Sequence, residues 1–166
     1  MLAAEMNDNT HLVIERIERA FANVRLGGGV SLREADVIDE YGTDAERKKA
    51  RAQDEQDDWG RIPEDLIAHY SWCLSFFDAE GMTFHLPAYM RFALRHYRDS
   101  ASASVDSTIY ALGHHDERFS GFTSPRRAAV RHFLKFMAYN GGRHVDSGSA
   151  KRALVDMWGV RTSSQH

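Results

Sequence analysis

The sequence lacks the residues and segments that would place the protein outside the cytoplasm. Cys73 is its single cysteine, so both an internal disulfide and a zinc site built from cysteines are excluded. No run of about 20 apolar residues is present to span a membrane. The first twelve residues lack the basic end and the apolar run of a signal peptide. These absences predict a cytoplasmic protein with no membrane association.

The sequence also lacks a surplus of positive charge. Its 21 Lys and Arg residues are outnumbered by 24 Asp and Glu residues, which gives a formal net charge of −3. Because neutralising phosphates requires a basic surplus, nucleic acid is not an expected partner. The 166 residues, 43% of them hydrophobic and 27% charged, are typical of one globular domain rather than of a disordered chain. We therefore expect residues 1–166 to form a single domain.

Apolar residues recur at helical spacing through most of the chain, whereas the alternating pattern of a strand is scarce. Several of the expected helices are marked by capping residues or by a proline in the first turn. The stretch 44–58 is highly charged and is expected to be a solvated helix. The expected helices start after Thr10, Ser31 and Thr43 and at Pro63, Pro87 and Pro125, and a short one covers 153–158.

The predicted fold is therefore an all-α, single-domain bundle of about six or seven helices. A brief extended segment at 83–86 and the unassigned segment 108–112 leave open a mainly helical fold with one short β-hairpin. Residues 1–9 and 161–166 are expected to fray, and the Ser- and Ala-rich residues 99–107 to form an internal flexible loop.

The helix that starts at Pro87 is apolar around most of its circumference, which predicts the most buried helix of the fold. Cys73 lies on an apolar helical stripe, which favours a core thiol over a nucleophile. The predicted core comprises Tyr89, Met90, Ala93, Leu94 and Tyr97 packed against Leu66, Tyr70, Phe77, Phe133 and Leu134.

An acidic cluster lies directly before Trp59. Paired carboxylates can act as acid and base when their surroundings separate their pKa values, but no apolar residues flank these in the sequence. The cluster is therefore either a solvated helical face or a docking surface, where charge attracts a basic partner and an exposed aromatic ring anchors it. Trp72 and Phe76 lie opposite the apolar stripe of their helix. The predicted partner-binding residues are Asp54, Glu55, Asp57, Asp58, Trp59, Trp72 and Phe76.

The residues His114, His115, Asp116 and Glu117 form the one dense set of potential metal ligands. Imidazole and carboxylate groups together suit a divalent ion that activates water. The dipeptide His115–Asp116 resembles the central pair of the HD phosphohydrolases, which implies a further histidine upstream and a carboxylate downstream. In those enzymes the pair lies on a helix, whereas here it lies in a polar segment flanked by glycine, so a solvated loop without metal or cofactor is favoured. The available partners are His69 or His96 and Asp146 or Asp156.

Basic residues gather on two of the expected helices. Planar arginine side chains suit carboxylates or phosphates. They form either a local basic ridge or ion pairs with the acidic stretch, and ion pairing is the favoured interpretation. These residues are Arg91, Arg95 and Arg98, together with Arg126, Arg127, Arg131 and Lys135.

Three segments of the chain, Trp59 to Pro63, Phe84 to Met90 and the pair Phe133–Leu134, carry a resemblance to a known family. They are similar to the Trp-x-x-Ile-Pro segment, the Phe-x-Leu-Pro-Ala-Tyr-Met segment and the Phe-Leu helix of a family of small bacterial proteins of unknown function. The resemblance covers about residues 17 to 139 and implies a shared fold. It implies no reaction, because the matching residues serve packing and turns.

The leading functional hypothesis is a non-enzymatic protein-binding module of the bacterial cytoplasm, such as an immunity or antitoxin-like inhibitor of a basic toxin domain. Small size, mild negative charge and the lack of a catalytic constellation favour it. The alternative is a metal-dependent hydrolase that uses residues 114–117. A homodimer joined through Trp72, Phe76 or Trp158 is a third possibility.

Overall fold

The structure is a computed structural model that describes residues 2–159. This part of the chain forms eight α-helices and four short 3-10 helices, without a strand, so the predicted all-α class is confirmed and the β-hairpin alternative is wrong. None of the described helices is long and apolar enough to cross a bilayer. The helices are α1 (Leu2–Ala20), α2 (Leu32–Asp39), α3 (Asp44–Ala52), η1 (Trp59–Arg61), α4 (Glu64–His69), η2 (Ser71–Ser75), α5 (Ala79–His96), α6 (Ser104–Ala111), η3 (Glu117–Phe119), α7 (Ser124–Asn140), η4 (Gly142–His144) and α8 (Ser147–Asp156).

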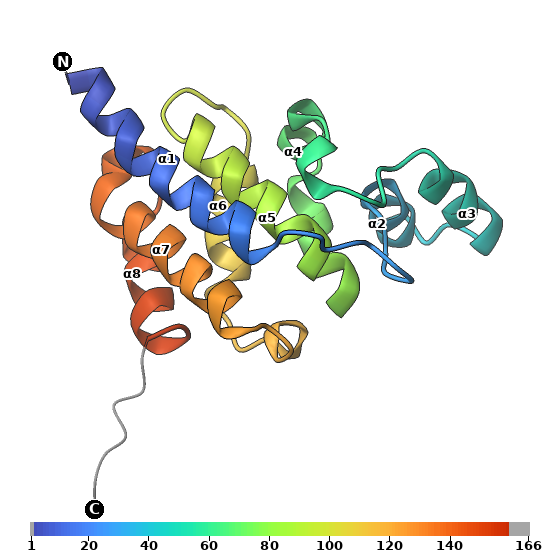
Figure 1. The fold of residues 1–166 in the computed structure, drawn as a ribbon. Helices are drawn as coiled ribbons and strands as arrows, with labels where there is room; N and C mark the ends of the chain where they lie inside the picture. The colour runs from blue at the N-terminus through green and yellow to red at the C-terminus, as the bar shows by residue number, and fades with distance from the viewer. Residues whose placement is uncertain (1, 160–166) are drawn as a thin grey trace, which may run out of the picture.

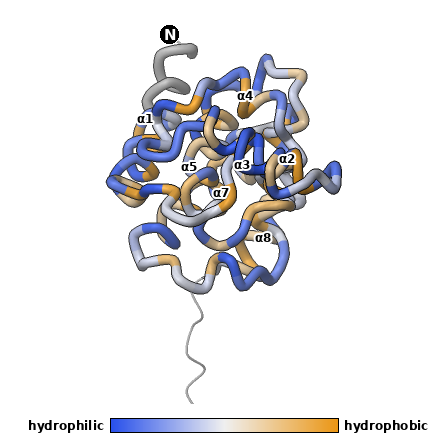
Figure 2. Tube along the Cα trace, turned by 90° about the vertical axis from the view of Figure 1, so that its right-hand side faces the viewer, coloured by the Kyte–Doolittle hydropathy of each residue, from blue (hydrophilic) through white to orange (hydrophobic). Residues whose placement is uncertain are grey.

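Helix α5 is the centre of the fold and packs against both α1 and α6 (Figure 1). Helix α7 lies between α1 and α8, and the hairpin of α2 and α3 projects at one end of the molecule. The core is continuous from α1 to α8, and Figure 2 shows α3, by contrast, as a mostly hydrophilic helix. All the residues that the sequence assigns to the core lie in it or, like Leu66 and Tyr70, pack against its edge.

Residues 83–86 are helical rather than extended, because α5 starts at Ala79 and continues through Pro87. The Asp78 side chain caps this start by accepting a hydrogen bond from the Gly81 amide at 2.8 Å. Proline inside a helix removes one backbone hydrogen bond and costs about 3 kcal/mol. The burial of α5 on most of its surface outweighs that cost, since twelve of its residues are buried.

The predicted loop 99–107 is wrong in its second half, where α6 begins at Ser104, and residues 108–111 continue the helix. The serines of this segment bind the end of α4. Ser104 donates a hydrogen bond from Oγ to the Ile67 carbonyl oxygen at 2.6 Å, and Ser102 donates one to Ala68. Because Val105 and Ile109 then reach the core, the segment folds as a helix despite its polar sequence.

Three helix boundaries also differ from the sequence-based expectation. Helix α1 begins at Leu2, ahead of Thr10, and the charged helix ends at Ala52. The helix expected to start at Pro63 ends at His69 and is followed by the tighter helix η2. The acidic cluster therefore lies in turns, and Trp72 lies on a 3-10 helix. Residues 161–166 lie outside the described residues.

Candidate functional site

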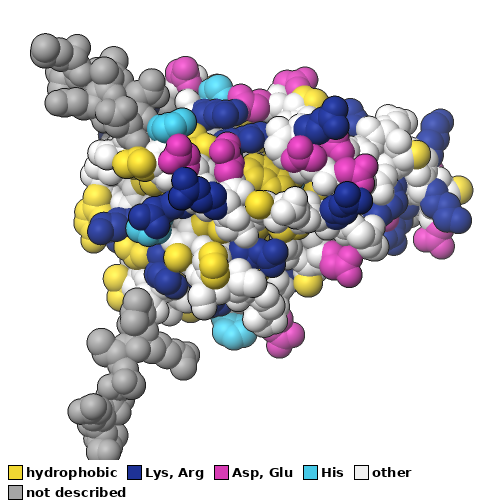
Figure 3. Space-filling view, in the orientation of Figure 1, with side chains coloured by type: hydrophobic (Ala, Val, Ile, Leu, Met, Phe, Trp, Pro, Cys, Tyr) yellow, Lys and Arg dark blue, Asp and Glu magenta, His cyan; other side chains and the backbone are white. Residues whose placement is uncertain are grey.

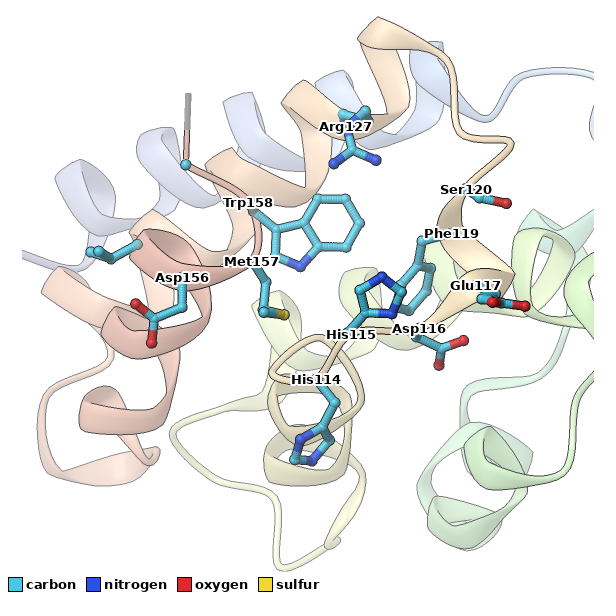
Figure 4. A pocket seen from close by; sticks show the side chains of 12 residues that line it. His114, His115, Asp116, Glu117, Phe119, Ser120, Arg127, Asp156, Met157 and Trp158 are labelled. Atoms are coloured by element: carbon cyan, nitrogen blue, oxygen red, sulfur yellow. The ribbon is translucent and has the colours of Figure 1, made fainter. Parts of the chain in front are cut away.

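Two neighbouring hollows on the described surface share His114 and Asp116 in their walls. The first, which we call the α8 hollow, has a volume of about 740 Å³ and lies between η3, the first turns of α7 and the end of α8 (Figure 4). The second, the η2 hollow, has a volume of about 310 Å³ and lies between η2 and α6. The segment 114–117, for which metal binding was the alternative to a solvated loop, is thus a ridge between two concave surfaces.

Aromatic rings line the α8 hollow. Trp158 is buried, and its Nε1 atom donates a hydrogen bond to the Leu112 carbonyl oxygen at 2.9 Å. The Arg127 guanidinium lies 5.0 Å from the centre of the Trp158 ring. Figure 4 shows the carboxylates of Asp156 and Glu117 on opposite sides of this hollow. Because Trp158 is held inside the molecule, it cannot supply the exposed ring of a dimer interface.

Asp116, a metal ligand in the alternative interpretation of this segment, is held by Arg118. Both Asp116 carboxylate oxygens accept hydrogen bonds from that guanidinium, the shortest at 2.6 Å, and these bonds lower the pKa of Asp116. Arg118 also donates to the carbonyl oxygens of Leu74 and Phe77, at 2.7 and 2.9 Å. The arrangement ties η3 to the chain just before α5. The interpretation of this segment as a solvated loop is therefore wrong for Asp116, although His115 and Glu117 are exposed.

Three of the four residues that could complete a metal site are engaged elsewhere, and the fourth, Asp156, lies across the α8 hollow from Glu117. His96 contacts Glu64 at 2.6 Å, His69 packs edge-on against the rings of Tyr70 and Trp72, and Asp146 caps α8 by accepting from the Ser149 amide at 3.0 Å. Among residues 9–159, whose side chains the structure describes, no three His, Cys, Asp or Glu side chains come together as a set that could hold a metal ion. The described residues therefore do not bring together the ligand set that the resemblance to the HD phosphohydrolases implies.

Two exposed aromatic residues line the η2 hollow, and a carboxylate orients each of them. Trp72 is 38% exposed, and its Nε1 atom donates a hydrogen bond to Asp36 at 3.0 Å. Tyr110 is 46% exposed, and its hydroxyl group donates to Asp146 at 3.1 Å, which raises the pKa of Tyr110. Phe76 is only partly buried but packs against the core. The η2 hollow therefore presents two aromatic rings in fixed orientations.

Trp59 is not the exposed anchor that its position after the acidic cluster suggests. It is 5% exposed, its Nε1 atom donates to the Phe21 carbonyl oxygen at 3.0 Å, and the Arg91 guanidinium lies 4.9 Å from the centre of its ring. Burial against the end of α1 makes it a core residue, which corrects its assignment to a docking surface.

The carboxylates of the acidic cluster mostly bind their own chain. Asp54 is nearly buried and accepts two hydrogen bonds at 2.7 Å from Arg33, one from its backbone amide and one from its guanidinium. Glu55 accepts from the amides of Asp57 and Asp58, and Asp58 accepts from the Gly60 amide at 2.8 Å. The cluster stabilises the turns between α3 and η1 and does not form one helical face, so that expectation is also corrected.

The expected pairing of the basic helices with the acidic cluster is largely absent among the described residues. Arg95 pairs with Glu64 at 2.8 Å, and Arg91 lies 3.9 Å from Glu18 and donates to the Gly60 carbonyl oxygen. Cys73 is buried in the core as predicted, and burial raises the pKa of its thiol. Its neutral, enclosed sulfur is unsuited to nucleophilic catalysis.

Tyr110 was not among the residues predicted from the sequence to bind a partner. It lies in the segment that could not be assigned to helix or strand, and only a helical assignment would have placed it outside the apolar face of Val105, Ile109 and Leu112. The missing signal is therefore the helical periodicity of 104–112, which is masked by two serines and a threonine.

The comparisons with known proteins bear on the family alone. No curated protein and no solved structure matches the chain. A family model matches residues 9–162, which is most of the chain and includes every residue of the two hollows. The protein therefore belongs to a family of unknown function, DUF6714.

Proposed function

We propose that the protein is a non-enzymatic protein-binding module of the bacterial cytoplasm, and that the η2 hollow holds a basic segment of its partner. The observation that carries the proposal is the pair of exposed rings, Trp72 and Tyr110, each fixed by a carboxylate. Tryptophan and tyrosine are enriched among residues that dominate binding energy. Rings that are already oriented lose less side-chain entropy on binding, which increases affinity.

The charges around the η2 hollow favour a basic partner. Asp36 and Asp146 lie beside the two rings, whereas the nearby cation Arg118 is neutralised by Asp116. The adjoining α8 hollow carries the carboxylates of Glu117 and Asp156 together with the Arg127 guanidinium (Figure 4). Carboxylates around an aromatic anchor attract a basic surface and speed its association. An immunity or antitoxin-like inhibitor of a basic toxin domain would use such a surface.

The test uses the intact protein as bait in an extract of its host, followed by binding kinetics with the recovered partner. Trp72→Ala and Tyr110→Ala are each expected to weaken binding by tenfold or more, about 1.4 kcal/mol. Tyr139→Ala is the matched control because Tyr139 is 64% exposed on α7, away from the hollow. Far-UV circular dichroism checks that all three variants fold.

The expected partner is basic where it contacts the module, and its association slows as salt concentration rises. Equal binding by wild type, Trp72→Ala and Tyr110→Ala would contradict the proposal. Weakening by Tyr139→Ala to the same extent would place the partner on another face and would also contradict it.

A further inference from the structure

Helix α7 carries a stripe of positive charge on its outer side. Arg127, Arg131 and Lys135 follow one another at intervals of four residues, which places them on one face, and α7 contains no acidic residue. Helix α1 packs against α7, with its end at Ala20 close to Arg126, and brings Arg16 to the same region. In Figure 3, Lys and Arg side chains gather over α1 and α7 with a histidine among them.

No carboxylate of α1 or α7 whose side chain the structure describes neutralises this charge. Glu15 on α1 faces His11 at 3.3 Å, and Glu18 lies toward Arg91. Across the described part of the chain, Arg16, Arg131 and Lys135 form no ion pair. Like charges four residues apart destabilise a helix, so an uncompensated set on adjacent helices has a cost to folding.

His132 marks the centre of this charged region. It is half-buried between Arg131 and Lys135 along α7. Burial lowers its pKa, and the neighbouring charges of Arg16, Lys135 and Arg131 lower it further. Arg131 and Lys135 are one turn apart beside His132 on α7, and Arg16 is one turn before Ala20 on the adjacent α1, so the cations come from two packed helices rather than from one extended track.

We propose that Arg16, Arg131, His132 and Lys135 form a binding site for a compact phosphate group, such as a diphosphate, at the seam between α1 and α7. Arginine forms two parallel hydrogen bonds with phosphate, lysine adds a point charge, and imidazole adds a donor. A phosphate group carries up to two negative charges on one centre, whereas a carboxylate carries one. The chain as a whole is negative, which disfavours an extended nucleic acid on the same patch.

The site is tested by titrating the purified protein with sodium phosphate and sodium pyrophosphate at constant ionic strength, followed by NMR of the His132 imidazole. We expect a saturable shift of the His132 signals, with pyrophosphate binding about tenfold more tightly than phosphate because of its higher charge. Bound phosphate also cancels the surrounding positive charge, so the pKa of His132 rises in the complex.

The double variant Arg131→Gln and Lys135→Gln is expected to weaken pyrophosphate binding by tenfold or more. The matched control is Lys48→Gln and Lys49→Gln, two cations of α3 that lie on another part of the surface. Shifts that do not saturate, or that are equal in the two double variants, would overturn the proposal. Unfolding curves establish that both double variants remain folded.

Adenosine diphosphate and a phosphoserine peptide are then compared as two sources of the same chemical group. The site is supported if either ligand binds the wild-type protein and does not bind the Arg131 and Lys135 double variant. It is overturned if neither of these ligands nor pyrophosphate binds the wild-type protein. The site is independent of the η2 hollow, so Trp72→Ala is expected to bind pyrophosphate as wild type does.

Discussion

Trp59 donates a hydrogen bond from its indole Nε1 atom to the backbone carbonyl oxygen of Phe21, at a distance of 3.0 Å. Both residues are buried, and Arg91 covers the indole ring. The bond joins η1 to the end of α1, 38 residues earlier in the chain. The Trp-x-x-Ile-Pro segment therefore packs η1 against the end of α1 in this chain.

Replacing Trp59 by Phe is expected to lower the free energy of unfolding by about 0.5–1.5 kcal/mol, the net contribution of one hydrogen bond, because the Phe21 carbonyl oxygen keeps only its longer bond from the Val24 amide, at 3.4 Å. The matched control is Trp72→Phe, since Trp72 is partly exposed and water can replace its hydrogen bond. That change is expected to stay within about 0.5 kcal/mol. Urea unfolding monitored by circular dichroism measures both, and a Trp59→Phe variant as stable as wild type would contradict the role of the bond.

Helix α3 is held to α2 by polar contacts, because none of its residues is buried. The buried carboxylate of Glu34 accepts a hydrogen bond from Arg47 at 3.0 Å and lies 3.4 Å from Arg51. The same carboxylate accepts from the Ser31 amide at 3.0 Å and so caps α2. One side chain thereby links the start of α2 to two turns of α3.

The variant Glu34→Gln is expected to release α3 while the rest of the fold stays intact. Loss of the charge weakens both arginine contacts, which are worth about 1–3 kcal/mol as hydrogen bonds to a charged group. Amide hydrogen exchange should therefore rise by about tenfold in α3 and remain unchanged in α5. Glu40→Gln, at an exposed position that ends α2, is the control and is expected to leave exchange in α3 unchanged.

The burial of His85 predicts that the free energy of unfolding falls at acidic pH. His85 lies in α5, is fully buried and stacks on the ring of Phe77. Its Nδ1 atom donates a hydrogen bond to the Gly81 carbonyl oxygen at 2.6 Å, and its Nε2 atom has no hydrogen-bond partner within the described residues. Burial lowers its pKa from 6.5 to about 4. The unfolded chain therefore takes up a proton between these two values, and the folded chain does not.

Above pH 6.5, protonation of His85 is thus expected to leave the free energy of unfolding unchanged. As the pH drops to 4, protonation of this residue in the unfolded chain is expected to lower the free energy of unfolding by about 3 kcal/mol. In His85→Leu this part of the acid dependence disappears. The measurement is a series of urea unfolding curves between pH 7 and 4 on wild type and the variant. His114→Leu, at an exposed position, serves as the control. Parallel curves for wild type and His85→Leu would show that His85 is not the acid-sensitive group.

The sequence was sufficient to predict the all-α class and the burial of α5, because these depend on periodicity within one segment. It was not sufficient at Trp59, since an aromatic residue after an acidic cluster has the same local pattern whether it is exposed or covered by a distant helix end. Pro87 likewise shows that a local pattern does not reveal tertiary contacts. A proline predicts a helix start locally, but tertiary burial of the residues on both sides of it keeps α5 continuous.

The candidate site was harder to predict because its residues come from distant segments. Trp72 was identified from its place opposite an apolar stripe, but its partner Asp36 lies 36 residues away. Asp116 was identified as a potential ligand from its neighbours His114 and His115. Its actual partner, Arg118, lies two residues later, and that arginine also binds the chain near Leu74. The local sequence shows that such positions carry polar side chains. It does not show whether a carboxylate there binds a metal ion or pairs with an arginine.

The His114–Glu117 segment provides the last prediction. If it were a solvated loop, replacing His115 and Asp116 together by Ala would change stability by no more than about 0.5 kcal/mol. The structure predicts a larger loss that comes from Asp116 alone. Its carboxylate caps η3 by accepting from the Arg118 amide at 2.9 Å and fixes the guanidinium that binds the Leu74 and Phe77 carbonyl oxygens.

Asp116→Ala is therefore expected to lower the free energy of unfolding by about 1–3 kcal/mol, because charged hydrogen bonds to a partly buried group are lost. His115→Ala is the matched control, with an expected change within about 0.5 kcal/mol, since His115 is exposed. The Arg118 hydrogen bonds lower the pKa of Asp116. The ionised carboxylate therefore contributes to the free energy of unfolding at neutral pH, and this contribution is lost in acid as the carboxylate becomes protonated. Unfolding curves of both variants at pH 7 and at pH 3 measure this, and the gap between Asp116→Ala and wild type should narrow at the lower pH. A gap that is absent at pH 7 would mean that Arg118 holds η3 without the carboxylate.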